Sequence, residues 1–188
     1  DILERLVHAS VVDNEDRPLM RAKAEAPKLS KMFGYGYAKE WGLELATDLN
    51  DWRKGLISWA DVDNGIFLSG PPGVGKSIFA KALAAECDVP LVSGSLGQWQ
   101  ARGHLGDLLK AMRAAFQRAK DQAPAILFID ELDSMGDRET FEHDNSSYSV
   151  QVVNAFLECL DGVDGREGVI VVGATNNVKR IDPAILRP

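Results

Sequence analysis

Cysteine is scarce in this sequence, which holds only Cys87 and Cys159 among 188 residues. Two cysteines cannot build the set of several disulfides that stabilises small secreted domains. Both lie in apolar sequence with helical spacing, so we interpret them as reduced core residues and expect a cytoplasmic protein. The sequence also has no internal repeat and no low-complexity tract, which excludes fibrous and disordered chains and leaves an ordinary globular composition.

Excess positive charge and long apolar runs are absent as well. The 21 basic residues are outnumbered by 28 acidic ones, giving a net charge of -7, so the chain lacks the positive field that grips phosphate backbones. No stretch approaches the roughly 20 apolar residues of a membrane span, and the first residues do not form a basic and then apolar signal. We therefore expect a single domain with no membrane segment in this chain, and the composition indicates no nucleic-acid partner.

Short apolar runs alternate along the chain with segments of helical spacing. Apolar residues recur with helical spacing in four segments, 38–49, 77–86, 105–120 and 148–160. Short runs that are apolar throughout occupy residues 66–68, 90–92, 125–129 and 169–172. Strands of this kind separated by helices are typical of a parallel sheet covered on both faces, so we predict an α/β, doubly wound fold. The polar segment 137–149 is predicted to be a mobile loop.

A glycine-rich segment follows the first of these apolar runs. Residues 70–77 match the pattern G-x-x-x-x-G-K-[ST] in full. Glycines let backbone N–H groups turn toward a phosphate, and the following helix presents its positive N-terminal end to the same anion. Lys76 can reach the β- and γ-phosphates of a nucleotide, and the Ser77 hydroxyl can bind Mg²⁺. We expect the nucleotide to contact Gly70, Pro71, Pro72, Gly73, Val74, Gly75, Lys76, Ser77 and Ile78.

Polar residues follow two later apolar runs. Asp130 and Glu131 would lie at the carboxyl end of a strand, the edge where ligands bind in open α/β sheets. Asp130 can hold Mg²⁺ and Glu131 can orient an attacking water. The structural alternative is a strand that simply ends in a charged turn. The phosphate loop upstream favours the first interpretation. Asn176 follows the next run, and its spacing fits a contact with the γ-phosphate or the attacking water as well as it fits a turn.

Taken together, these segments resemble the classical AAA ATPases in order and spacing. Within that family, the segment around the nucleotide site resembles bacterial AAA proteins and the ATPase core of the membrane-bound AAA metalloproteases. The family resemblance rests on five segments, residues 70–77, 126–131, 157–162, 173–177 and 181–188. The last of them, Ile-Asp-Pro-Ala-Ile-Leu-Arg-Pro, resembles the start of the second region of homology of that family and is more specific than the phosphate loop.

The resemblance implies a P-loop NTPase core with a mainly parallel, five-stranded sheet that works in a ring, usually a hexamer, with ATP and Mg²⁺ as cofactors. It implies that Lys76 and Ser77 act on phosphate and metal, that Asp130 and Glu131 are the Walker B acids, and that Asn176 senses the γ-phosphate. Lys76, Glu131 and Asn176 are therefore the expected catalytic residues, with Ser77 and Asp130 at the metal.

The resemblance also divides the chain. Residues 1–33 are unassigned and are interpreted as an N-terminal extension or linker, whereas 34–188 resemble the large α/β subdomain. The arginine fingers and the helical lid of the family would follow the point at which this sequence stops, so we expect the lid to be absent. No His-Glu-x-x-His zinc motif occurs in the sequence.

Two further correspondences with the family leave alternatives open. Gly34, Tyr35 and Gly36 resemble the turn that lines the adenine pocket, although a structural aromatic turn fits almost equally well. The central-pore loop of the family corresponds to residues 104–106, so His104 stands where an aromatic residue is usual. Trp99 could supply that ring instead, or it could belong to the core.

The function implied by the resemblance is Mg²⁺-dependent ATP hydrolysis by a motor module that remodels or unfolds polypeptide substrates. An alternative from a different class is a nucleotide-binding scaffold or switch with little intrinsic hydrolysis. Such a module would form a homo-oligomer and would contact a polypeptide substrate.

Overall fold

The fold centres on a parallel sheet of four strands in the part of the chain that the structure describes. The structure is a computed structural model that describes residues 26–101, 103–135, 146–162 and 165–185. The strands are β1 (Gly65–Ser69), β2 (Leu91–Ser95), β3 (Ala125–Asp130) and β4 (Val169–Thr175). They pair in the order β1-β4-β3-β2, and every pair is parallel.

Each apolar run that predicted a strand is a strand, but the expected number of five is wrong for the described residues, which hold four. The chain contains four apolar runs of this kind, and the fifth strand came only from the family resemblance. β1 lies at one edge of the described sheet and is partly exposed, whereas β3 and β4 lie inside the sheet and are buried almost throughout.

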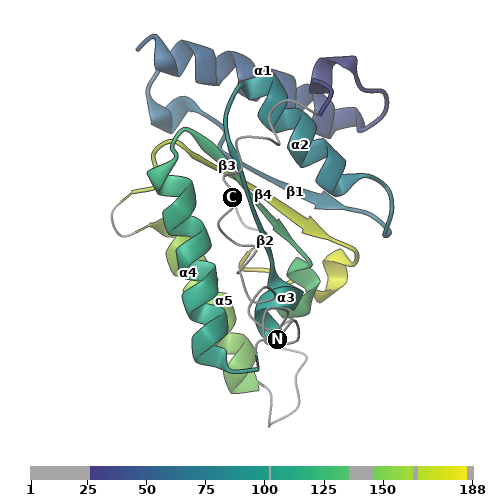
Figure 1. Ribbon diagram of the computed structural model, residues 1–188, viewed down its shortest axis with the longest axis vertical. Helices are drawn as coiled ribbons and strands as arrows, with labels where there is room; N and C mark the ends of the chain where they lie inside the picture. The colour runs from purple at the N-terminus through teal and green to yellow at the C-terminus, as the bar shows by residue number, and fades with distance from the viewer. Residues whose placement is uncertain (1–25, 102, 136–145, 163–164, 186–188) are drawn as a thin grey trace, which may run out of the picture.

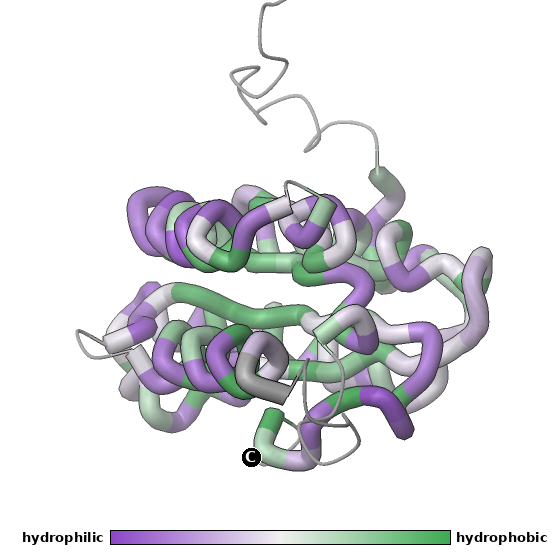
Figure 2. Tube along the Cα trace, turned by 90° about the horizontal axis from the view of Figure 1, so that it is seen from below, coloured by the Kyte–Doolittle hydropathy of each residue, from purple (hydrophilic) through white to green (hydrophobic). Residues whose placement is uncertain are grey.

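Helices cover both faces of the sheet, which confirms the doubly wound α/β prediction. The helices are α1 (Gly36–Arg53), α2 (Lys76–Cys87), α3 (Leu96–Gln100), α4 (Leu105–Asp121) and α5 (Ser146–Asp161). α1 and α2 lie on one side of the sheet and α4 and α5 on the other (Figure 1). Seen from below, the apolar strands run between two layers of helix (Figure 2). Residues 146–149 of the predicted loop belong to α5, and the loop residues 137–145 lie outside the described residues.

The core has two halves because successive strand residues point to opposite faces. In β3, Ile126 and Phe128 face the α1 and α2 side, whereas Leu127 and Ile129 face the α4 and α5 side. The first half contains the predicted helical stripe Trp41, Leu45 and Leu49 with Phe79 and Leu83 of α2; the second contains Leu108, Met112 and Phe116 of α4 with Val152 and Phe156 of α5.

α1 approaches α2 closely at Gly42. A Cβ at this position would lie 2.5 Å from Leu29 Cδ2 and 2.9 Å from Leu83 Cδ1, so a side chain there would force the helices apart.

Cys87 lies in the same half of the core, and its burial raises the pKa of its thiol to about 12. Both cysteines are free, with Cys87 buried and Cys159 half-buried. Within the described ranges, no helix combines the length and the apolar character needed to cross a bilayer.

The parallel arrangement brings the carboxyl ends of all four strands to one edge of the sheet. Ser69 at the end of β1 pairs with Thr175 at the end of β4, and Ser95 at the end of β2 pairs with Asp130 at the end of β3. Whatever follows each strand is therefore gathered at this edge, as expected for ligand sites in open α/β sheets.

Candidate functional site

The glycine-rich segment forms the loop between β1 and α2. Gly73 and Gly75 adopt left-handed φ values of 85° and 93°, and α2 begins directly at Lys76. The first N–H groups of α2 have no partner within the helix, so the positive end of the helix faces the loop. This is the backbone arrangement that binds phosphate.

Lys76 lies at the centre of the site. Its Nζ donates hydrogen bonds to the carbonyl oxygens of Gly70, at 2.6 Å, and Pro71, at 3.2 Å, and to Asn176 Oδ1, at 2.8 Å. The last contact joins residues 100 positions apart in the sequence. A pocket of about 340 Å³ opens here, lined by Pro72, Gly73, Gly75, Lys76, Ser77, Ile78, Asp130, Glu131 and Asn176. The structure thus brings six of the nine predicted phosphate-loop residues to one pocket with both predicted Walker B acids and the predicted sensor. Gly70, Pro71 and Val74 do not line this pocket.

The two acidic residues leave the end of β3 in different directions. The Glu131 N–H donates to Asp130 Oδ1 at 2.8 Å, and Glu131 has a left-handed φ of 60° that turns the chain out of the strand. Ser95 Oγ, at the end of the neighbouring strand β2, donates to Glu131 Oε2 at 2.6 Å. This contact engages the carboxylate that an attacking water would need as its base.

Sequence reasoning did not identify Ser95. Its hydroxyl also accepts a hydrogen bond from the Gln98 N–H and so caps the start of α3. The register that sets Ser95 opposite Asp130 appears only once β2 and β3 are aligned. The apolar run that predicted this strand ends at residue 92, three residues before Ser95, so the sequence pattern gave no signal for it.

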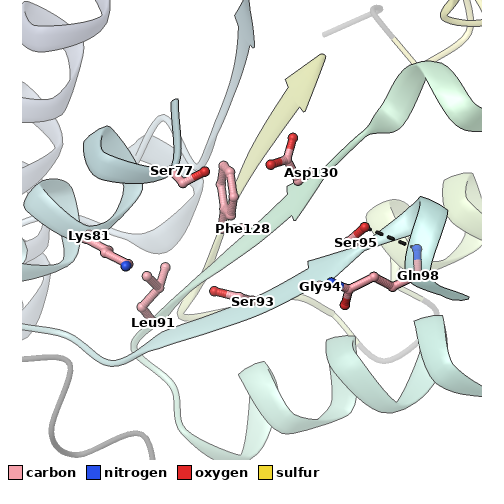
Figure 3. Close-up of a pocket in the computed structure, with 9 residues that line it drawn as sticks. All are labelled: Ser77, Lys81, Leu91, Ser93, Gly94, Ser95, Gln98, Phe128 and Asp130. Atoms are coloured by element: carbon pink, nitrogen blue, oxygen red, sulfur yellow. Dashed lines mark hydrogen bonds between the residues drawn. The ribbon is translucent and has the colours of Figure 1, made fainter. Parts of the chain in front are cut away.

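Ser77 and Asp130 supply hard oxygen donors that fit Mg²⁺. Both line the pocket at Lys76, and both also line a neighbouring pocket of about 240 Å³, into which they project from α2 and β3 (Figure 3). No cluster of three or more His, Cys, Asp or Glu side chains with metal-binding geometry occurs in the described part of the chain. Two protein oxygens suit Mg²⁺, because this ion keeps several waters and takes phosphate oxygens as further ligands. The residues present therefore fit ATP with Mg²⁺.

The two asparagines after β4 have different surroundings. Asn176 points to Lys76, whereas Asn177 Oδ1 accepts a hydrogen bond from the Lys179 N–H and caps the short 3₁₀ helix at residues 178–180. The turn interpretation therefore fits Asn177, and the interpretation as a site residue fits Asn176. Asp133, which sequence reasoning also missed, accepts hydrogen bonds from Thr175 Oγ, at 3.0 Å, and from the Asn176 N–H, at 3.3 Å.

The predicted adenine turn lies directly against the phosphate loop. Tyr35 has a left-handed φ of 68°, and its ring packs on Phe79 with the ring centroids 5.3 Å apart. Its hydroxyl donates to the Gly75 carbonyl at 3.1 Å. The flanking Gly34 and Gly36 also have positive φ values. Contact between this turn and adenine remains a prediction.

The two candidates for the pore-loop residue differ in exposure. Trp99 is buried, with its ring packed so closely on Gly94 that a Cβ there would overlap it, so the core interpretation of Trp99 fits. His104 is exposed and precedes α4 as its N-cap residue. The expected loop at 104–106 is shorter than predicted, because Leu105 and Gly106 already form the first turn of α4.

Comparison with known proteins places the chain among AAA proteins. A sequence model of the family described as "ATPase family associated with various cellular activities (AAA)" matches residues 66–187. The ATP-dependent zinc metalloprotease FtsH of Ureaplasma parvum is 37% identical over 163 residues, which cover 86% of this chain and 22% of that protein. The human ATP-dependent zinc metalloprotease YME1L1 is 38% identical over 155 residues, covering 82% of this chain and 20% of the relative.

A solved structure, the FIGL-1 AAA domain in complex with ADP, superimposes with a TM-score of 0.66 at 28% identity. The match covers 84% of this chain and 51% of that one. The chain spans about a fifth of the length of the two metalloproteases. Since the family model covers residues 66–187 and the sheet carries the matching motifs at one edge, the chain belongs to the AAA family of ATPases.

Proposed function

We propose that this chain binds ATP with Mg²⁺ and hydrolyses it as the nucleotide-binding module of a ring-shaped motor, a homo-hexamer, that remodels polypeptide substrates. The observation that carries the proposal is the convergence of Lys76, Asn176 and the two acids at positions 130 and 131 on one pocket. Similarity to FIGL-1, whose AAA domain binds ADP, supports the nucleotide, and similarity to the two metalloproteases supports a protein substrate.

Each residue has a role that follows from its place. The N–H groups at the start of α2 and the Lys76 ammonium offset the negative charge of the phosphates. Ser77 and Asp130 would hold the metal, and Glu131 would accept a proton from the attacking water. Asn176 donates its amide N–H toward the γ-phosphate while its Oδ1 accepts from Lys76, which orients the amide. The Mg–ATP complex supplies the transferable phosphoryl group and a cation that neutralises its oxygens.

Binding to the polypeptide is assigned to the exposed segment before α4. His104 lies outside the packed core there, and its imidazole is the side chain we propose to contact substrate in the pore. The free thiols of Cys87 and Cys159 suit a reducing compartment, so we propose the cytoplasm as the site of action.

A second candidate is a nucleotide-binding switch with little hydrolysis. The Ser95 hydroxyl favours it, because the bond to Glu131 engages the carboxylate that hydrolysis requires. Steady-state phosphate release, measured per subunit over a range of protein concentrations, separates the two. A motor whose sites are completed by a neighbouring subunit shows a rate per subunit that rises with concentration, whereas a switch releases almost no phosphate at any concentration.

Two substitutions test the residue roles. We expect Glu131→Gln to keep ATP affinity and to abolish turnover, since the amide cannot accept the proton. Lys76→Ala should remove nucleotide binding. Exposed residues of similar type, Glu40→Gln in α1 and Lys110→Ala in α4, serve as matched controls and should behave as wild type. Undiminished turnover by Glu131→Gln would refute its assignment as the base.

A further inference from the structure

Asp133 connects the turn after β3 to the end of β4. It lies in the 3₁₀ helix Leu132–Met135, which is anchored by the buried side chains of Leu132 and Met135. A single carboxylate oxygen, Oδ1, accepts from Thr175 Oγ at 3.0 Å and from the Asn176 N–H at 3.3 Å. Because the two bonds share one acceptor, they fix the direction in which the chain leaves β4.

The Thr175 hydroxyl extends this contact. Thr175 is 1% exposed, and its Oγ donates to Asp133 while it accepts from the Asn177 N–H at 3.0 Å. A hydroxyl that both donates and accepts has its rotor set, so the backbone from Thr175 to Asn177 is held on both sides of Asn176. From this backbone position, the exposed Asn176 side chain places its Oδ1 2.8 Å from Lys76 Nζ.

We propose that Asp133 is the positioning residue for Asn176: it does not line the pocket at Lys76, but it sets the amide of Asn176 against Lys76. The inference rests on the proposed function, because a γ-phosphate contact by Asn176 belongs to that function. It adds a residue outside the phosphate loop and outside the two strand-end acids. Because Asp133 acts through Asn176, we expect it to affect the affinity for a nucleoside triphosphate and not the affinity for a nucleoside diphosphate.

The test measures affinity for ATPγS and for ADP separately on the 188-residue chain. Removing the acceptor in Asp133→Ala should weaken ATPγS binding about tenfold, the effect of losing the one proposed hydrogen bond from the Asn176 amide to the charged γ-phosphate. ADP affinity should change less than about twofold. Asp133→Asn keeps Oδ1 as an acceptor and should restore most of the affinity for ATPγS. Ser134→Ala, in the same turn and exposed, is the matched control and should resemble wild type.

A double substitution tests whether Asp133 works through Asn176. If it does, Asp133→Ala combined with Asn176→Ala binds ATPγS no more weakly than Asn176→Ala alone. Thr175→Val, which removes the donor and keeps the shape, supplies a second test where Asp133→Ala folds poorly, and it should show the same loss for ATPγS alone. Three outcomes would each overturn the inference. They are equal losses of affinity for ATPγS and ADP, additive losses in the double variant, and unchanged ATPγS affinity in both Asp133→Ala and Thr175→Val.

These outcomes separate the inference from the proposed function. Failure of the wild-type chain to bind either nucleotide counts against the proposed function. Wild-type binding of both nucleotides, with unchanged selectivity in Asp133→Ala, counts against the role of Asp133 alone.

Discussion

The contact between Tyr35 and Gly75 makes the shape of the phosphate loop depend on the predicted adenine turn. A Cβ added at Gly75 would lie 2.5 Å from Tyr35 Oη, closer than carbon and oxygen approach without displacement. Gly75 also has a φ of 93°, where a residue with a Cβ is strained. We therefore predict that Gly75→Ala weakens nucleotide binding for two separate reasons.

The magnitude follows from those two reasons. The left-handed backbone costs about 1–2 kcal/mol for an L residue. Displacing the Tyr35 hydroxyl forfeits its bond to the Gly75 carbonyl, about 1 kcal/mol. Together they give about 2–3 kcal/mol, or roughly a 30- to 150-fold loss of affinity for ADP. Tyr35→Phe alone removes only the hydrogen bond and should lose roughly fivefold.

The two changes should not add. In Tyr35→Phe the nearest ring atom, Cζ, lies 3.5 Å from a Cβ at Gly75, an ordinary contact. The double variant therefore has the same backbone strain and the same lost hydrogen bond as Gly75→Ala, and it should bind ADP with the same affinity. Isothermal titration with ADP measures all four proteins, with thermal unfolding as a check on folding. A double variant that is fivefold weaker than Gly75→Ala, or a Gly75→Ala that binds as wild type, would refute the reasoning.

Three further predictions concern packing and the buried thiol. Gly173→Ala should lower the thermal unfolding midpoint by several degrees, because a Cβ there would lie 2.6 Å from the buried Leu132 side chain and 2.6 Å from the Phe67 ring. Gly106→Ala, in the first turn of α4, meets nothing within 4 Å and should leave the midpoint unchanged or raise it. Iodoacetamide should alkylate the half-buried Cys159 well before Cys87, as mass spectrometry of timed samples would show; equal rates would contradict the burial. Burial raises the pKa of the Cys87 thiol to about 12 from an ordinary 9.0, so the unfolded chain loses this proton at a lower pH than the folded chain. The stability that the protonated thiol contributes is therefore complete below pH 9 and is lost as the pH rises toward 12. Urea titrations of Cys87→Ala should show a smaller loss of stability over that range than those of the wild type.

Most of the architecture was predictable because it depends on hydrophobic spacing. Trp41, Leu45 and Leu49 recur at steps of four and are buried along one face of α1. The apolar runs at 125–129 and 169–172 became β3 and β4, since a strand covered on both faces must be apolar throughout. The expected number of strands is wrong for the described part of the chain because it came from resemblance rather than from a run of residues in this sequence.

The candidate site was predictable only where a residue belongs to a local motif. The residues from Gly70 to Ser77 and the acids after β3 are adjacent in sequence, so spacing identifies them. Ser95 and Asp133 act on residues 36 and 42 positions away, across strands whose register no local pattern records. For the same reason, the sequence left the role of Asn176 open, and only the 2.8 Å contact with Lys76 distinguishes it from Asn177.

The hydrogen bonds at the site follow the order of strands in the sheet rather than the order of residues in the chain. From β2 to β3, Ser95 donates to Glu131; from β4 to the turn after β3, the Asn176 N–H donates to Asp133; from the loop after β1, Lys76 donates to Asn176. The strand order β2-β3-β4-β1 therefore sets which polar groups can meet. Because β4 lies between β3 and β1, a residue at its end is the one that can contact both the acidic turn and the phosphate loop. This placement explains why the residue expected to distinguish ATP from ADP directly follows β4, and why a change at Asp133 should reach Lys76 through Asn176.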